Sequence, residues 1–236
     1  MDSKSKYGDD KNTESFMDYY VFFPIGDILL PILYKLGITP NMVTLISTIC
    51  TVSSISYLNM KKPNFKKFAI LYVLGYFFDC IDGRLARKYN QGSTFGMLFD
   101  SVSDIVTNSL LILTYVFNFY KQKNFKYILP ALIVISHRIS VNYGIMEAEE
   151  CYKKNNHDNF YEYKKKMLKD FDNTLLKTVL KRIYLKIHRV SYETYRNLYP
   201  NYDKEKISKD FKKTKEIGFG NYSIFVVLVI YFTMLN

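Results

Sequence analysis

The chain predicts an all-α, polytopic membrane protein in which an amphipathic interfacial helix precedes the spanning helices. Three observations predict this class. Apolar residues gather in stretches near the ~20 residues that cross a bilayer, although the mean hydropathy of the whole chain is −0.10. Polar residues gather in an N-terminal tail and in a basic segment near the other end. Four aspartates interrupt the apolar part, and charges at membrane depth usually mark a functional site.

Composition divides the chain into four parts. We expect a disordered tail over 1–15, an interfacial helix plus membrane core over 16–147, a basic polar insertion over 148–216, and a C-terminal transmembrane helix over 217–236. The expected spans are 42–59, 67–88, 94–119, 127–147 and 218–236. The first is weakly hydrophobic because serine and threonine are frequent in it, and the second carries charges. In the insertion, the basic segment Thr174–Val190 predicts a surface helix rather than a span.

The segment Tyr19–Leu36 precedes the first span. It is apolar, but prolines interrupt it at Pro24 and Pro31, and it carries Asp27 and Lys35. These features favour a helix that lies in the membrane interface over one that crosses the membrane.

The first span begins at Thr39 and Pro40, a helix-capping residue followed by a proline at the first helical position. This explanation leaves out Asn41 and Thr44, which share one helix face. Local capping and contact with a ligand both remain open for these two residues.

The four aspartates are spaced so that they meet. Asp79 and Asp82 are three residues apart, and Asp100 and Asp104 are four apart, so each pair shares a helix face. The midpoint between Asp82 and Asp100, and that between Asp79 and Asp104, both fall within residues 89–93, whose composition is typical of a turn. If the chain reverses there, all four carboxylates lie at matching depth.

Four adjacent carboxylates in a low-dielectric environment need positive charge to stay ionised. An all-oxygen cluster favours a hard cation, Mg²⁺, Mn²⁺ or Ca²⁺, over zinc. Two divalent ions would balance four aspartates, and paired metals suit in-line displacement at phosphorus. We therefore expect two ions, Mg²⁺ or Mn²⁺.

Small residues lie beside the aspartates. Gly83 and Ala86 share the face of Asp79 and Asp82, and Gly96 lies one turn before the second pair. A planar or phosphorylated ligand could approach the backbone closely at these positions.

An alternative is a structural hairpin in which Arg84 or Arg87 forms ion pairs with Asp79 or Asp82. Two arginines cannot neutralise four aspartates, and the small residues would then have no role.

The complete pattern, D-x-x-D-G-x-x-A-R, eight residues, then G-x-x-x-D-x-x-x-D, resembles the signature of the class I CDP-alcohol phosphotransferases. The matching positions are Asp79, Asp82, Gly83, Ala86, Arg87, Gly96, Asp100 and Asp104. Eight fixed positions at fixed spacing form a specific pattern. The resemblance implies an enzyme that transfers the substituted phosphate of a CDP-alcohol to an acceptor hydroxyl and releases CMP, in phospholipid synthesis.

The resemblance also implies roles for individual residues. Asp79, Asp82 and Asp100 would bind metal, and Asp104 would be the general base with access to a second metal. The string Pro40-Asn41-x-x-Thr44 is similar to a shorter family element near the nucleotide site. The residues expected to bind CDP are Asn41, Thr44, Asp82, Gly83, Ala86, Arg87 and Gly96.

Family members usually have six spanning helices after a juxtamembrane helix, so five to six spans are expected here. The donor would be CDP-diacylglycerol or a CDP-amino alcohol. The acceptor stays open among inositol, glycerol phosphate, serine, diacylglycerol and other polyol phosphates. A homodimer is compatible with the resemblance.

Arg138 lies near the middle of the fourth expected span, at about the depth of the aspartates. Its guanidinium would suit a phosphate of the donor or acceptor. An ion pair with an aspartate or with Glu147 explains it equally well. The neighbouring His137 is expected to be an ordinary polar residue facing a wet cavity.

The net charge of +11 fits attraction to anionic lipid headgroups. Nucleic acid is not expected as a partner, because the lysines are scattered and no nucleic-acid fold signature occurs.

The family places its active site on the cytosolic face of the membrane, and we expect the same orientation here. A catalytically inactive scaffold that binds nucleotide or lipid is the alternative function, and a cation channel would leave the small residues unexplained.

Overall fold

The computed structural model describes residues 14–122, 165, 168, 174–198, 205–206, 209 and 219–234. Within them every regular element is helical: the π-helix η1 (Asp18–Phe22) and the α-helices α2 (Phe23–Lys35), α3 (Pro40–Leu58), α4 (Phe65–Lys88), α5 (Thr94–Gln122), α8 (Leu175–Leu198) and α10 (Phe219–Met234). The expected span 127–147, with His137 and Arg138, lies outside the described residues. So do residues 1–13 and much of 148–216.

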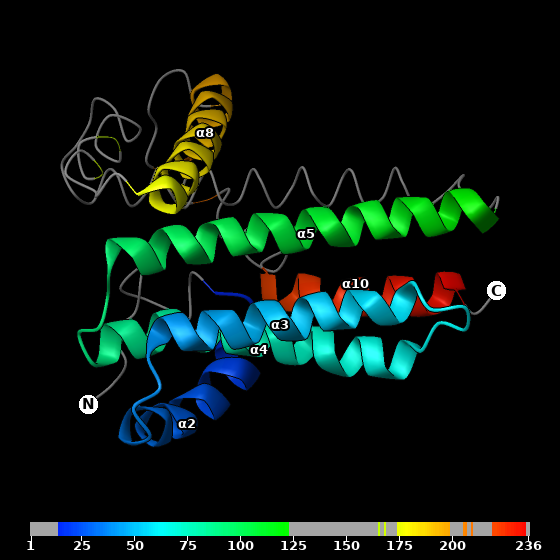
Figure 1. Cartoon of the computed structure of the whole chain (residues 1–236), viewed down its shortest axis with the longest axis horizontal. Helices are drawn as coiled ribbons and strands as arrows, with labels where there is room; N and C mark the ends of the chain where they lie inside the picture. Colours follow the sequence, from blue (N-terminus) through cyan, green and yellow to red (C-terminus); the bar gives the residue numbers. More distant parts are fainter. Residues whose placement is uncertain are drawn as a thin grey trace.

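Four helices, α3, α4, α5 and α10, run side by side (Figure 1). The helices α2 and α8 lie near the end of this bundle at which α3 and α5 begin, and both are inclined to its axis. The helices predicted over 42–59, 67–88, 94–119 and 218–236 are all present, with ends that differ by a few residues from the prediction.

Among the described helices, two are long and apolar enough to cross a membrane, Pro40–Leu58 and Thr94–Thr114. Large apolar side chains are exposed on the outer faces of the bundle, including Ile49, Ile70, Leu113, Phe117 and Leu228. Outward-facing apolar side chains are what a surface against lipid requires. The protein is an all-α membrane protein.

The α3–α4 hairpin is closely packed. Thr39 caps α3 as expected, because its side chain accepts a hydrogen bond from the backbone N–H of Met42. At Gly75 the two helices approach so closely that a Cβ atom would lie 2.3 Å from Oγ1 of Thr51 and 3.1 Å from the carbonyl oxygen of Ser47. Small residues allow this kind of approach between membrane helices.

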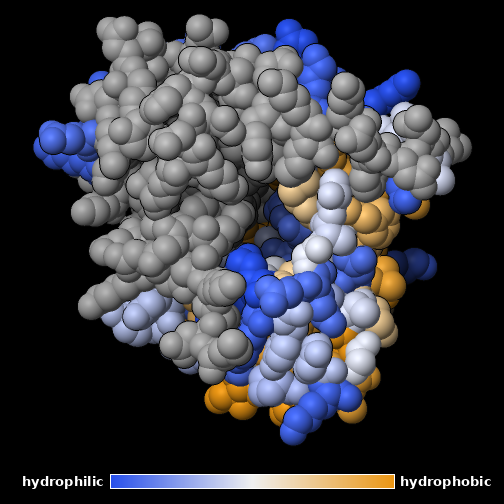
Figure 2. All heavy atoms as spheres, turned by 90° about the vertical axis from the view of Figure 1, so that its left-hand side faces the viewer, coloured by the Kyte–Doolittle hydropathy of each residue, from blue (hydrophilic) through white to orange (hydrophobic). Residues whose placement is uncertain are grey.

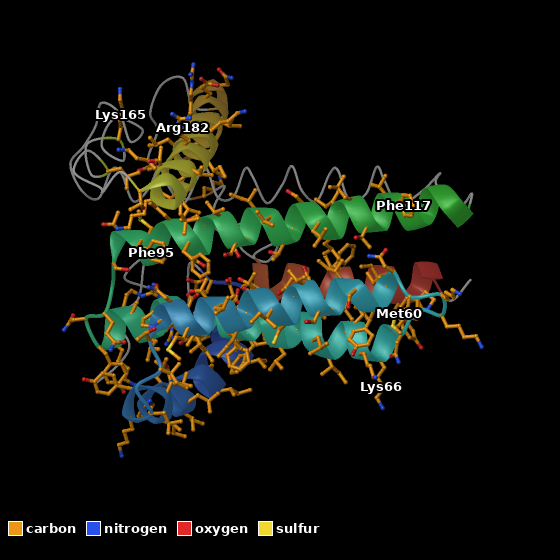
Figure 3. All side chains as sticks on the ribbon, in the orientation of Figure 1. Met60, Lys66, Phe95, Phe117, Lys165 and Arg182 are labelled. Carbon is orange, nitrogen blue, oxygen red and sulfur yellow. The ribbon has the colours of Figure 1, made fainter. Side chains whose placement is uncertain are left out.

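A cluster of buried apolar residues packs between the helices at the end of the bundle away from the α4–α5 turn. This cluster contains Ile55, Leu58, Phe68, Tyr72, Leu111, Val226 and Ile230. Met60 and Lys66, in the loop between α3 and α4 and at the beginning of α4, mark the same end in Figure 3, whereas Phe95 marks the opposite end.

The predicted interfacial segment forms η1 and α2. Leu30 of α2 packs against Val43, Ile81 and Leu85 of the hairpin. The opposite face of α2 exposes apolar side chains, with 69% of Ile28 accessible. A helix with one apolar face against the bundle and another exposed is suited to the membrane interface.

The segment predicted as a basic surface helix is helical and extends to Leu198 as α8. It packs across the beginning of α5, where Leu180 and Tyr184 meet Leu98 and Val102. Its exposed Arg182 is labelled in Figure 3. Figure 2, viewed from this end of the bundle, shows hydrophilic residues facing the viewer and hydrophobic ones at the rim.

Candidate metal centre

The turn between α4 and α5 reverses the chain where the sequence predicts it. Asn90 has a positive φ of 53°, a conformation that asparagine tolerates better than most residues. The backbone N–H of Gly96 donates to Oγ of Ser93 over 2.9 Å, which satisfies one of the free N–H groups at the beginning of α5. The end of α4 and the beginning of α5 therefore lie at the same end of the bundle, and both helices pack against α3.

Asp79, Asp82 and Asp100 form a cluster in which one carboxylate oxygen from each lies within 4.8 Å of the others. Asp82 is buried, and the other two are half-buried. Asp104 lies beside them and interacts electrostatically with all three, most strongly with Asp79. All four predicted aspartates are therefore brought together.

The chemistry of this cluster fits a hard divalent cation. Its ligands are all carboxylate oxygens, the donors that Mg²⁺, Mn²⁺ and Ca²⁺ prefer. Oxygens bound to one such ion at about 2.0–2.6 Å lie within about 5 Å of one another, which matches the observed separation. Without a cation, three ionised carboxylates so close together would repel one another strongly.

Thr44 orients one member of the cluster. Its Oγ1 lies 2.5 Å from Oδ2 of Asp82 and 3.1 Å from the carbonyl oxygen of Pro40. Thr44 therefore contacts the aspartate cluster as well as the backbone of its own helix. Hydrogen bonds of this kind hold metal-binding carboxylates in position.

Two of the small residues make room for polar side chains. A Cβ atom at Gly96 would lie 2.6 Å from Oδ1 of Asn41, so the glycine allows α3 and α5 to meet through this amide. A Cβ atom at Gly83 would lie 3.1 Å from a guanidinium nitrogen of Arg87. Ala86 is half-buried on the same helix.

Arg84 forms its ion pair with α2. Its guanidinium contacts both carboxylate oxygens of Asp27, at 2.8 and 3.3 Å, and stacks over the ring of Phe23. The side chain of Arg84 is only 6% exposed. One of the two arginines considered as partners of the clustered aspartates thus forms an ion pair with the interfacial helix.

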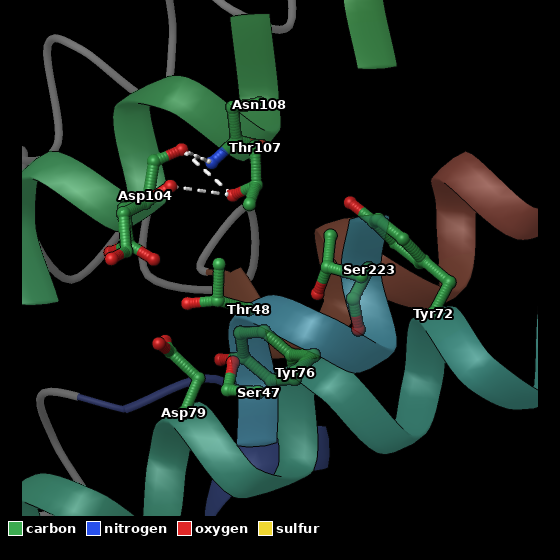
Figure 4. A pocket seen from close by; sticks show the side chains of 11 residues that line it. Ser47, Thr48, Tyr72, Tyr76, Asp79, Asp104, Thr107, Asn108 and Ser223 are labelled. Atoms are coloured by element: carbon green, nitrogen blue, oxygen red, sulfur yellow. Dashed lines mark hydrogen bonds between the residues drawn. The ribbon is translucent and has the colours of Figure 1, made fainter. Parts of the chain in front are cut away.

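A cavity of about 130 Å³ adjoins the aspartates on the side away from the α4–α5 turn. Figure 4 shows Asp79 of α4 and Asp104 of α5 on its opposite walls, with Thr48 of α3 between them. Every lining side chain carries oxygen: Ser47, Thr48, Thr51, Tyr72, Tyr76, Asp79, Ser103, Asp104, Thr107, Asn108 and Ser223.

The sequence prediction missed the hydroxyl groups of this cavity. A signal was available, because Thr44, Ser47, Thr48 and Thr51 follow each other at helical spacing on α3. These residues lower the mean hydropathy of the span, and an average does not show that they lie on one face of the helix.

A second buried carboxylate, Asp18 of η1, lies outside the cluster. Its oxygens accept hydrogen bonds from the hydroxyls of Ser15 and Tyr76, each at 2.7 Å, and from the backbone N–H of Gly220 at 3.2 Å. The thiol of Cys80 lies 3.8 Å away. Burial raises the pKa of the Asp18 carboxyl above its ordinary value, and these hydrogen bonds oppose the increase.

The fold and the site together define an integral membrane protein with a cluster of carboxylates, contributed by α4 and α5, that could hold a metal ion. The CDP-alcohol phosphatidyltransferase family matches residues 37–160. The chain belongs to this family, and the four aspartates lie within the matched region.

The curated relatives of the chain carry names that belong to the same family. The chain is 28% identical over 114 residues to CDP-diacylglycerol–inositol 3-phosphatidyltransferase 1 of Arabidopsis thaliana, covering 48% of each protein. It is 35% identical over 107 residues to the CDP-diacylglycerol–inositol 3-phosphatidyltransferase of Candida albicans, covering 45% of this chain and 44% of the relative. The chain thus matches less than half the length of these relatives. No solved structure matches it.

Proposed function

We propose that the protein transfers the phosphatidyl group of CDP-diacylglycerol to a hydroxyl of inositol and releases CMP. The observation that carries the proposal is the convergence of Asp79, Asp82 and Asp100 within 4.8 Å, with Asp104 beside them. The names of the relatives support the choice of donor and acceptor.

The aspartates divide between two roles. Asp79, Asp82 and Asp100 would hold divalent ions, Mg²⁺ or Mn²⁺, and Asp104 would reach a second ion. When bound, such ions neutralise charge on the pyrophosphate and on the departing CMP. Thr44 keeps the Asp82 carboxylate aimed at the centre.

Asp104 acts as the general base. Its carboxylate takes the proton of the acceptor hydroxyl, whose oxygen then attacks the β-phosphorus of the donor. The bond from the β-phosphorus to the bridging oxygen breaks, and CMP leaves with the electron pair. Positioning of the two substrates supplies much of the rate.

The nucleotide would lie along the small-residue faces of α4 and α5. Asn41, Gly83, Arg87 and Gly96 would border it, and Arg138 would bind a phosphate.

The end of the bundle that contains the α4–α5 turn would face the cytosol, where CDP-linked donors are found. A membrane-impermeant thiol reagent should then label Gln91→Cys in the α4–α5 turn from the cytosolic side of sealed vesicles, in a background carrying Cys151→Ser. Labelling only from the other side would reverse the orientation.

The test is CMP release by the full chain in lipid nanodiscs with Mg²⁺ or Mn²⁺. CDP-diacylglycerol with inositol should release CMP, and Asp104→Asn should reduce the rate about 10²–10⁴-fold, the usual contribution of a general base. CDP-choline and CDP-ethanolamine with diacylglycerol serve as the competing substrate pairs.

Normal turnover by Asp104→Asn would exclude this residue as the base. Metal-dependent binding of CDP without CMP release from any pair would favour the scaffold alternative. If CDP did not bind either, the centre would have a different function.

A further inference from the structure

The hydroxyl-lined cavity next to the aspartates has no role in the proposed chemistry so far. Its walls come from α3, α4, α5 and α10, and Asp79 and Asp104 form one side of it. The large apolar cluster at the far end of the bundle contains Tyr72, which also lines the cavity. The cavity is therefore a polar space between the metal centre and the apolar half of the membrane protein.

Several of the lining groups use their protons within the protein. Thr48 donates to the carbonyl oxygen of Thr44 over 2.8 Å, Thr107 donates to that of Ser103 over 2.9 Å, and Tyr76 donates to Asp18. These groups cannot donate to a ligand at the same time.

Three other hydroxyls are different. Ser47, Thr51 and Ser103 make no side-chain hydrogen bond within the described part of the chain, and Ser47 is only 7% exposed. A buried hydroxyl without a partner is unfavourable. These three groups can each donate one hydrogen bond to a ligand that carries acceptors.

The cavity lies deeper than the metal centre, measured from the α4–α5 turn. Thr107 is three residues beyond Asp104 on α5, about 4.5 Å along the helix, and Thr51 is seven residues beyond Thr44 on α3. A soluble polyol would approach from the polar end of the bundle. In a diacylglycerol lipid, by contrast, the two ester carbonyls lie on the membrane side of the phosphate.

We propose that this cavity binds the ester-bearing glycerol backbone of a diacylglycerol donor, with Ser47, Thr51 and Ser103 donating to its carbonyl oxygens. The inference rests on the proposed function for the identity of the donor. It assigns to the cavity a specificity for ester-linked over ether-linked lipid, because a dialkyl donor has the same chains and headgroup but no carbonyl acceptors.

The experiment compares CDP-diacylglycerol with its dialkyl ether analogue in nanodiscs, at saturating inositol. The wild type should favour the ester in kcat/KM by about tenfold or more, as expected for one or two hydrogen bonds. The double variant Thr51→Val/Ser103→Ala keeps the side-chain shapes and should bring this ratio close to one. Its KM for inositol should not change.

Ser56→Ala is the matched control, because its exposed hydroxyl lies on the same helix α3 and donates to the carbonyl oxygen of Ser53. It should keep the ester preference. Thermal unfolding of each variant in nanodiscs checks that the fold is retained.

An unchanged ester preference with a raised KM for inositol would overturn the proposal and assign the cavity to the acceptor. An unchanged preference with an unchanged KM would also overturn it and leave only water in the cavity. If the wild type released no CMP, the proposed function would fail by itself. Equilibrium binding of the ester and ether donors to wild type and double variant, which needs no turnover, would then decide this inference separately.

Discussion

Asp18 and Asp82 are two buried aspartates of the same molecule, with exposed fractions of 3% and 6%. Their surroundings differ. Asp18 is surrounded by donors, since the hydroxyls of Ser15 and Tyr76 and the backbone N–H of Gly220 all point to its oxygens. These bonds replace much of the solvation that burial removes.

Among the described residues, Asp82 has one side-chain donor, Thr44, and two further carboxylates within 4.8 Å, those of Asp79 and Asp100. Three carboxylates so close together repel one another when ionised, and added positive charge would relieve this repulsion. The comparison shows how a buried carboxylate whose hydrogen bonds join helices differs from one that lies among other carboxylates and could bind a cation. Burial alone does not distinguish the two.

The largest expected effect is at the cluster. Asp82→Asn should lower CMP release about 100-fold or more, because an electrostatic stabiliser of the transition state is lost. Mg²⁺ should raise the unfolding temperature of the wild type but not of the variant, because only the wild type binds it in the folded state. Thermal unfolding with and without Mg²⁺ measures this, and equal stabilisation of both proteins would remove Asp82 from the metal site.

At Asp18 the main effect should be on stability. Gly220→Ala would place a Cβ atom 2.4–2.7 Å from the Asp18 carboxylate and should destabilise the fold by about 1–3 kcal/mol, as overpacking usually does. Activity per folded molecule should change little. Gly92→Ala is the control, because a Cβ atom there meets nothing within 4 Å. Equal unfolding temperatures for the two variants would contradict the tight packing around Asp18.

The stability of the wild type should depend on pH differently from that of the variant Asp18→Asn, which cannot ionise at this position. Because its folded pKa is raised, the contribution of this group to stability is fully present below its unfolded pKa, about 3.9. It is lost as the pH rises through the folded value. The unfolding temperature of the wild type should therefore fall relative to that of Asp18→Asn from about pH 4 upward. A difference between the two proteins that does not change with pH would contradict the raised pKa.

The smallest expected effect is at Cys80, which follows Asp79 in the sequence but faces Asp18. Its sulfur lies 3.8 Å from the Asp18 carboxylate, and a thiol is a weak donor. Cys80→Ala should lower stability by about 1 kcal/mol or less and leave CMP release unchanged. A strong loss of activity would place this thiol at the metal centre.

The spacing of the aspartates was sufficient to predict that they cluster. Two aspartate pairs with local helical spacing lie on either side of one short turn, so the reversal at that turn brings them to matching depth. The start of α3 followed from the capping residue Thr39 and from Pro40, and the reversal between α4 and α5 followed from the turn-forming residues 89–93. Apart from Ser15, the partners of Asp18 could not be predicted in this way, and neither could the partner of Arg84, because these residues are 57 to 202 positions away in the chain. Only the packing of separate helices determines such pairs.

The cavity was missed for a different reason. Hydropathy assigns one value to a whole span, but Ser47 and Thr51 face the inside of the bundle while Ile49 faces outward. Which face of a span points to a neighbour depends on the packing of the other helices.

The pair between Arg84 and Asp27 has an evolutionary consequence. Arg84 occupies a variable position of the family pattern, within the segment from Asp82 to Arg87, but it is tied to a residue of α2 that the pattern does not include. Loss of Asp27 alone would take its carboxylate away from the buried guanidinium of Arg84, which is strongly destabilising, whereas Asp27 is 39% exposed and would keep part of its solvation. The two positions should therefore diverge together, so that related chains with an arginine at one keep an acid at the other.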